Sequence, residues 1–242
     1  MRPIVADTNY SHSKLLHKHK LKRKNIEPFK TSPPWEFIPS VAAINVSEAI
    51  AAGGDLDGDG FADVLAAEPL FNSARGRILF FFGSSRGLPE TPQLTLEGNN
   101  PGDAFGTTVQ MVGDVNGDGL DDFLASERNE RNGFRAWVYF GHRERRFQRI
   151  EWSNATWPFP IGDINGDNFD DVAQYVPSDD LVYVYQGSEA GLGATPSCIL
   201  RSEQKGSHFG HDIASAGDIN GDGCDDLLVG AMKFNGRYQA GG

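Results

Sequence analysis

The fold is decided by the stretch GDLDGDGFAD, residues 54–63, because the same pattern recurs three times further along the chain. The later copies are GDVNGDGLDD at 113–122, GDINGDNFDD at 162–171 and GDINGDGCDD at 217–226. An aspartate or asparagine stands at positions 1, 3, 5 and 9 of each copy, counted from its first aspartate. One such stretch is often a solvated turn, but four in register indicate an internal repeat, which decides the architecture.

The segments around the four loops predict short strands. The loops begin roughly 50 to 60 residues apart, a period that fits a blade of four strands. The third strand of each period is apolar on both faces, which suits a strand packed between neighbouring blades. We expect first strands at 49–52, 108–112, 159–161 and 212–215, second strands at 63–66, 122–125, 171–173 and 226–229, third strands at 78–82, 136–140 and 181–185, and fourth strands at 94–96, 147–150 and 198–200.

The predicted fold class is therefore all-β, a β-propeller with four-stranded blades. Blades are expected at about 47–100, 101–152, 153–204 and 205–242, and the last is cut short, so about three and a half blades are visible. Because an unclosed propeller leaves open sheet edges, we expect a fragment of a longer protein. A four-blade ring completed by residues 35–46 and closure through an oligomer are the alternatives.

Residues 1–34 form a separate basic segment. Its first 30 residues hold eight lysines or arginines against two acidic residues, whereas the whole chain has a formal charge of −11. This composition is typical of a disordered lead-in, and a nucleic-acid or anionic-surface arm is the weaker interpretation. We expect no nucleic-acid partner for the acidic remainder.

The loops have the chemistry of a calcium site. Ca²⁺ takes six to eight hard oxygen ligands, and a chain wrapped around one ion turns alternate side chains inward. Positions 1, 3, 5 and 9 then supply side chains and position 7 a backbone carbonyl. The predicted ligands are Asp55, Asp57, Asp59, Phe61 and Asp63, then Asp114, Asn116, Asp118, Leu120 and Asp122, then Asp163, Asn165, Asp167, Phe169 and Asp171, and finally Asp218, Asn220, Asp222, Cys224 and Asp226.

Glycines in the loops support this geometry. Position 4 is always glycine, and position 6 is glycine except for Asn168, the type of side chain that best tolerates a left-handed backbone. An EF-hand loop starts in the same way but needs a glutamate at position 12 and flanking helices, and the sequence offers neither. The first loop has four carboxylates where the others have three, so it is predicted to bind calcium most tightly.

Signals for catalysis, disulfides and export are weak. His142, His208 and His211 read as surface histidines, and no arrangement typical of a hydrolase, zinc site or phosphate loop appears. Cys198 and Cys224 are expected to be unpaired. We find no apolar run of membrane-span length and no signal-peptide core. The glycosylation acceptor pattern occurs at Asn45 and Asn154, which would matter only in a secretory setting.

These features resemble the FG-GAP repeats of the integrin α-chain N-terminal propeller. The resemblance covers about residue 35 to the end and rests on the loops, on Phe-Gly at 105–106 and 209–210, on Gly-Ala-Met at 230–232 and on the looser Ala-Glu-Pro at 67–69. The third repeat has Trp-Pro-Phe-Pro at 157–160 in place of Phe-Gly, so its first strand is expected to be short or bent.

The resemblance implies about four Ca²⁺ ions, one per loop, and an extracellular or cell-surface location. It also implies a non-enzymatic binding or adhesion scaffold for a protein or glycan ligand. Further blades or a partner chain would complete the propeller. The alternative function is the propeller portion of a larger, phospholipase-like hydrolase.

Overall fold

Each repeat folds into an antiparallel sheet of its own. In the computed structural model, which describes residues 50–129, 133–152 and 158–235, three sheets have four strands and the fourth has two. Within each sheet the strands lie in chain order, as in a propeller blade. The bounds are β1 Ile50–Ala52, β2 Val64–Glu68, β3 Arg77–Phe81, β4 Leu94–Glu97, β5 Val109–Gly113, β6 Asp122–Asn129, β7 Gly133–Tyr139, β8 Arg149–Glu151, β9 Pro158–Gly162, β10 Asp171–Val176, β11 Leu181–Tyr185, β12 Cys198–Arg201, β13 Phe209–Ser215 and β14 Leu227–Ala231.

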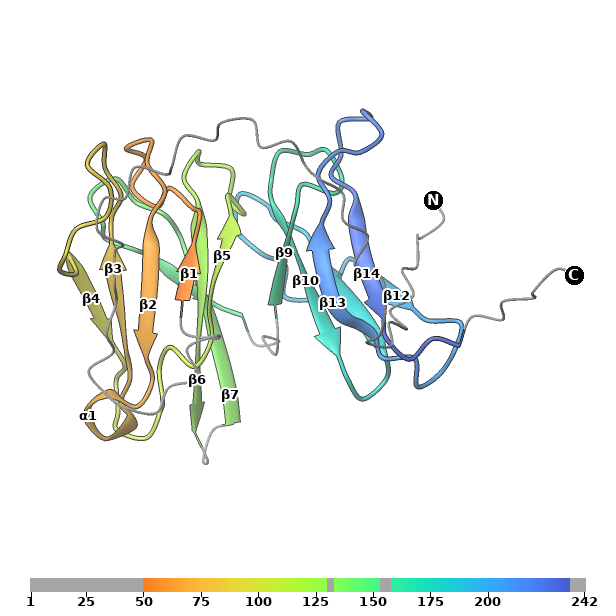
Figure 1. The fold of residues 1–242 in the computed structure, drawn as a ribbon, viewed down its shortest axis with the longest axis horizontal. Coiled ribbons are helices and arrows are strands. Elements are labelled where there is room, and N and C mark those ends of the chain that lie inside the picture. The colour runs from red at the N-terminus through yellow and green to blue at the C-terminus, as the bar shows by residue number, and fades with distance from the viewer. Residues whose placement is uncertain (1–49, 130–132, 153–157, 236–242) are drawn as a thin grey trace, which may run out of the picture.

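The all-β prediction and the strand assignments are confirmed. The sheets stand side by side in a row that runs from β1–β4 to β13–β14 (Figure 1). The one helix in the described part of the chain is α1 (Phe71–Ala74), a single irregular turn between β2 and β3. No helix within the described ranges has the length and apolar character needed to cross a membrane.

The first strand of the third blade, expected to be short or bent, is not shorter than that of the second blade. β9 has five residues, as many as β5, so the lack of Phe-Gly does not shorten it. Its pairing with β10 shifts register between Asp171 and Val172, and β5 and β13 show similar shifts. The basic segment 1–34, residues 35–46 and both candidate glycosylation sites lie outside the described residues.

The apolar cores lie between neighbouring sheets. Successive side chains of a strand point to opposite faces, so a strand in the middle of a blade must be apolar on both. In β3, Ile78 and Phe80 belong to the layer shared with the second blade, while Leu79 and Phe81 belong to a cluster on the other face. Phe80 meets Phe123 of β6 with ring centroids 5.4 Å apart. The blades are therefore held together by interdigitated strand faces.

The two Phe-Gly pairs bring neighbouring blades into close contact. Phe105 is buried in the layer between the first two blades. Gly106 has a φ of +86°, and a Cβ on it would lie 2.9 Å from the Cβ of Ala67 in β2. Gly210 faces the third blade in the same way, where a Cβ would overlap Val182. Glycine is needed here for both backbone conformation and space.

Candidate metal-binding loops

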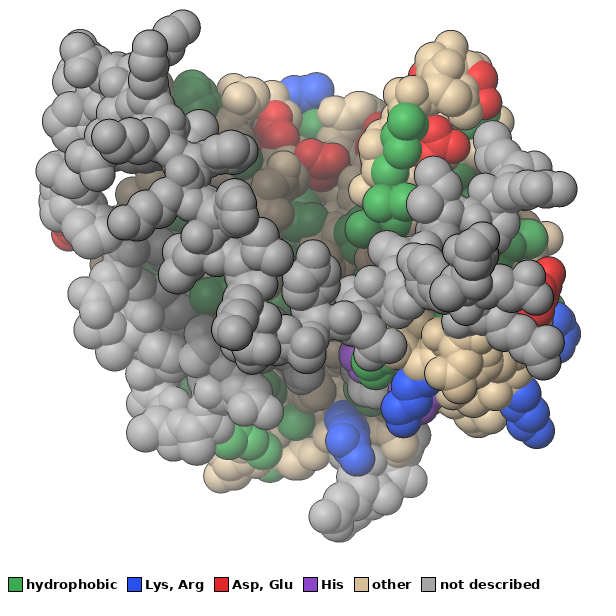
Figure 2. Space-filling model, turned by 45° about the vertical axis from the view of Figure 1, so that its right-hand side comes forward, with side chains coloured by type: hydrophobic (Ala, Val, Ile, Leu, Met, Phe, Trp, Pro, Cys, Tyr) green, Lys and Arg blue, Asp and Glu red, His purple; other side chains and the backbone are tan. Residues whose placement is uncertain are grey.

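The four acidic loops lie along one edge of the row of blades. Each joins the first strand of its blade to the second, that is β1 to β2, β5 to β6, β9 to β10 and β13 to β14. All four are at the upper edge of the view in Figure 1, and Figure 2 shows acidic side chains gathered along that edge. The fold therefore puts the predicted ligands of all four repeats on the same side of the molecule.

The aspartate at position 1 organises the turn of its own loop. In the second loop, the Asp114 carboxylate accepts hydrogen bonds from the backbone N–H groups of Gly117 at 2.7 Å, Asp118 at 3.1 Å and Gly119 at 2.8 Å. Asp163 and Asp218 accept the same three bonds in the third and fourth loops. The side chain thus holds the chain in a wrap around a central space.

Left-handed backbone at positions 4 and 6 completes the wrap. Gly58 and Gly60 have φ values of +68° and +88°, and the equivalent glycines of the other loops are similar. Asn168, which replaces the glycine of position 6, has a φ of +68°. The predicted reason for the asparagine is therefore confirmed.

The aspartate at position 9 is fastened at both oxygens. Asp122 Oδ2 accepts the N–H of Val115 at 3.1 Å, and Oδ1 accepts the N–H of Gly141, just after β7, at 2.8 Å. Asp63 and Asp171 make the same pair of bonds in their blades. Position 9 thus ties the loop to the end of the third strand and aims a buried carboxylate at the space inside the loop.

Burial disfavours the charged form of these three carboxyl groups. It raises the pKa of Asp122 to about 8, although the bonds from Gly141 and Val115 act in the opposite direction. Burial likewise raises the pKa of Asp63 and of Asp171 to about 6. A bound cation would remove this penalty, because it supplies the opposite charge that the site lacks.

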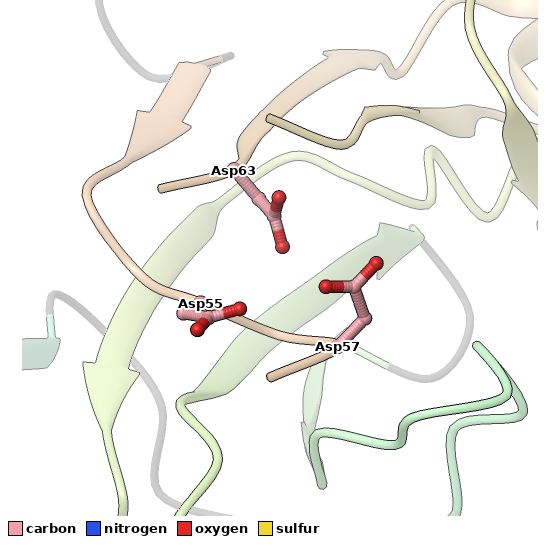
Figure 3. A group of neighbouring side chains, drawn as sticks. All are labelled: Asp55, Asp57 and Asp63. Atoms are coloured by element: carbon pink, nitrogen blue, oxygen red, sulfur yellow. The ribbon is translucent and has the colours of Figure 1, made fainter. Parts of the chain in front are cut away.

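In the first loop the carboxylates converge. Ligand oxygens of Asp55, Asp57 and Asp63 all lie within 4.8 Å of one another, and Figure 3 shows them arranged around one space. Within the described ranges this is the one place where three ligand atoms of His, Cys, Asp or Glu come so close. Clustered carboxylate oxygens fit a hard cation such as Ca²⁺ and do not fit a metal that prefers nitrogen or sulfur.

Asparagine replaces aspartate at position 3 of the other loops. Asn116 Oδ1 accepts the N–H of Asp118 at 3.0 Å, and its side-chain amide donates to the Asp118 carboxylate at 3.0 Å. Asn165 makes the same contacts with Asp167. In the second and third loops the side chains at positions 3 and 5 are therefore in contact with each other. The fourth loop is the most exposed, with Asp218, Asn220 and Asp222 at the surface.

A contact between loops, which the sequence analysis missed, comes from position 8. The Asp121 carboxylate accepts the N–H of Asp55 in the preceding loop at 2.7 Å, and the Asp121 N–H donates to the Asp55 carbonyl at 3.2 Å. Asp170 forms the same pair with Asp114, and the N–H of Asp225 donates to the third loop. We call this contact the loop latch. Burial raises the pKa of Asp170.

The side chain at position 7 packs against the preceding loop. A Cβ on Gly58 would lie 2.5 Å from Leu120, and one on Gly117 would lie 2.6 Å from Phe169. The side chains of Leu120 and Phe169 at position 7 therefore share a structural role, which is to pack against the preceding loop. Phe61, the position-7 residue of the first loop, is 41% exposed, whereas Leu120 is 7% exposed.

The remaining candidates bring no catalytic cluster together within the described residues. His142 lies in the turn after β7, where its N–H donates to the Leu56 carbonyl at 2.8 Å. His211 Nδ1 lies 3.6 Å from Asp212, and both side chains are exposed. Cys198 and Cys224 are free, as predicted.

Comparison with known proteins agrees with the loops and the blades. The family described as FG-GAP repeat matches residues 48–81 and 209–242, which contain the first and fourth loops. Integrin alpha-7 of Homo sapiens is 30% identical over 164 residues, or 58% of this chain. Integrin alpha-PS3 of Drosophila melanogaster is 32% identical over 196 residues, or 72%, and integrin alpha-8 of Mus musculus is 30% identical over 211 residues, or 75%. The matches span 13%, 17% and 19% of these relatives, so the chain corresponds to less than a fifth of each.

Proposed function

This chain is an FG-GAP repeat protein similar to integrin α chains, and from that premise we propose that it is a calcium-stabilised β-propeller scaffold for binding or adhesion. The observation that carries the proposal is the convergence of Asp55, Asp57 and Asp63 in a loop whose pattern recurs at the same joint of every blade. A scaffold of this kind presents surface to a partner and performs no chemistry on it.

Each loop would hold one Ca²⁺ through the side chains of positions 1, 3, 5 and 9 and the carbonyl of position 7. The bound cation would offset the repulsion between the carboxylates of its loop. The chain's own residues prepare the site: position 1 shapes the turn, and position 9 is fixed by two backbone N–H groups. We propose blade limits near 47–100, 101–152, 153–204 and 205–242, preceded by the basic segment 1–34.

The calcium would act on stability. Calcium sites in extracellular modules bind at roughly 10⁻⁴–10⁻³ M. At a calcium concentration tenfold above Kd, each site would add about 1.4 kcal/mol to the free energy of unfolding. Four sites together would then supply a large share of the net stability of a domain, which is about 5–15 kcal/mol. The likeness to integrins supports a cell-surface setting with a protein or glycan as the partner.

Thermal unfolding with calcium and with EDTA tests the proposal. We expect a clear rise of Tm in millimolar calcium relative to EDTA and a smaller rise in magnesium, because Mg²⁺ demands a tighter octahedral cage. Native mass spectrometry should find up to four calcium ions per chain. A Tm that is the same in calcium and in EDTA would refute the proposal.

A further inference from the structure

Arg145 occupies a turn position at which the neighbouring blades have glycine. The turn follows the third strand of each blade and is closed by the same backbone hydrogen bond: Gly87 to Ser84 at 2.8 Å, Arg145 to His142 at 2.7 Å, and Gly191 to Ser188 at 2.6 Å. The φ values are +90°, +58° and +85° respectively. Arginine is strained in this left-handed conformation, so some other contact must compensate.

The compensating contact is with the first loop. Arg145 Nη2 lies 2.7 Å from Asp57 Oδ2, and Nε lies 2.9 Å from the same oxygen. The guanidinium also stacks over the ring of Phe82, with its central carbon 3.9 Å from the ring centroid. Asp57 is 6% exposed, so the ion pair is shielded from water on the side of the carboxylate. Arg145 thus reaches from the second blade to a predicted calcium ligand of the first.

The two unusual residues of this pair occur together. Asp57 is the aspartate of position 3, where the other three loops have asparagine. The second loop has Asn116 at position 3, and the turn of the next blade, which lies beside that loop, has Gly191 in place of arginine. The extra negative charge and the extra positive charge therefore appear at the same joint. With Arg145 included, the four predicted side-chain ligands of the first loop carry the same net formal charge as those of each other loop, which is −3.

We propose that Arg145 is a built-in counter-charge that lowers the calcium affinity of the first loop and holds Asp57 in place when no calcium is bound. This inference rests on the proposed function, because it concerns how calcium binds. Counting carboxylates predicts that the first loop binds most tightly, but that count omits a cation in contact with one of them. A unit positive charge within a few ångströms of a divalent ion reduces its affinity by about tenfold or more.

The variant Arg145→Gly tests the proposal without endangering the turn. Glycine is the residue that the first and third blades have at this position, and it relieves the strain of the positive φ. The matched control is Arg146→Gly, which removes the same charge from the next residue. The Arg146 side chain is 80% exposed and pairs with Glu144, which is also exposed.

The measurement is a calcium titration of the full chain followed by NMR of glycine amides. Gly58 and Gly60 report on the first loop, and Gly117 and Gly119 report on the second loop in the same sample. We expect Arg145→Gly to lower the half-saturating calcium concentration at Gly58 and Gly60 by about tenfold. The second loop should not change, and Arg146→Gly should change neither. The double variant Asp57→Asn with Arg145→Gly should bring the first loop close to the second.

The outcomes separate this inference from the proposed function. One outcome is that calcium shifts the amide signals of both loops while Arg145→Gly leaves the calcium affinity of the first loop unchanged or lowers it. In that case Arg145 is no counter-charge, and the inference fails while the proposed function stands. If no glycine amide responds to calcium in the unmodified chain, the proposed function fails and the inference fails with it. Arg145→Gly should also widen the difference between the Tm in EDTA and the Tm in saturating calcium.

Discussion

The Asp170 carboxylate accepts the backbone N–H of Asp114 at 2.8 Å, and the Asp170 N–H donates to the Asp114 carbonyl at 2.9 Å. The two residues belong to successive blades, so one side chain closes a two-point contact between them. Asp114 also shapes its own loop, and Asp170 is followed directly by Asp171 of the next loop. The latch therefore connects the backbone of one candidate metal site to that of the next.

Removing this latch should destabilise the protein. We expect Asp170→Ala to lower the free energy of unfolding by about 1–3 kcal/mol, because a half-buried N–H loses a charged acceptor. Urea denaturation in saturating calcium measures the effect. Glu189→Ala removes the same charge from an exposed position of the same blade and should stay within about 0.5 kcal/mol of the unmodified chain. Equal effects of the two substitutions would mean that the latch adds nothing.

The glycine of the second Phe-Gly pair should not tolerate a side chain. A Cβ on Gly210 would overlap Val182 and lie 3.0 Å from Tyr175, at a φ of +90°. Gly206 has a φ of +76° and nothing near its Cβ position, so it isolates the backbone cost. We expect Gly206→Ala to cost about 1–2 kcal/mol and Gly210→Ala clearly more, as measured by thermal unfolding. Similar costs would show that close packing is unimportant at this joint.

Calcium binding to the second loop should release a proton at neutral pH. Burial raises the pKa of Asp122 to about 8, so this group is largely protonated at pH 7 in the calcium-free protein. Asp63 and Asp171, with pKa values of about 6, are largely ionised there and should release protons only at lower pH. Calorimetry at pH 7 in buffers of different ionisation enthalpy measures the release. A calcium-binding enthalpy that does not depend on the buffer would contradict the expectation.

The same carboxyl groups set how the calcium-free fold depends on pH. The pKa of Asp122 rises from 3.8 to about 8 on folding, so the folded state binds the proton more tightly than the unfolded state. The stability that this group contributes is full below pH 4 and is lost as the pH rises through 8. We therefore expect the Tm in EDTA to rise when the pH is lowered from 8 to 6. Saturating calcium should weaken this trend, since it binds the ionised form.

Exchanging the residues at position 6 should move stability in opposite directions. Asn168 has a φ of +68° in the third loop, where the second loop has Gly119 with a φ of +82°. Asn168→Gly should stabilise the protein by about 0.5–1 kcal/mol, and Gly119→Asn should destabilise it by a similar amount. Urea midpoints of the two variants decide this. If both substitutions destabilise, Asn168 makes a contact of its own that outweighs its backbone strain.

The strands and loops could be predicted from the sequence because both are local and repeated. A strand such as β11 is apolar on both faces within five residues, and the spacing of aspartate and glycine indicates the geometry of each loop. The absence of Phe-Gly led to a wrong expectation only for the length of β9, where Pro158 and Phe159 still pair with β10. Local pattern was therefore sufficient for the blades.

The contacts between loops could not be predicted in this way. Asp121, Asp170 and Asp225 recur at position 8, and that recurrence was a visible signal, but their partner is a backbone group of another blade. Nearly every residue type has the same backbone N–H, so the sequence does not indicate which N–H the aspartate at position 8 will contact. The pair of Arg145 and Asp57 is 88 residues apart in the chain, and its members stand out only when loops and turns of different blades are aligned.

Position 8 also makes the order of the blades matter. Each latch points one way, from the later blade to the earlier one, and Ala62 occupies position 8 of the first loop. A following blade with aspartate at position 8 can therefore latch onto the first blade. The first blade itself has no carboxylate at position 8 with which to latch onto a preceding blade. In an engineered chain with the second and third blades exchanged, every carboxylate latch would be kept. If the first blade were moved to a place between two other blades, one carboxylate latch would be lost. Substituting Ala62 with aspartate would make the modules interchangeable in this respect.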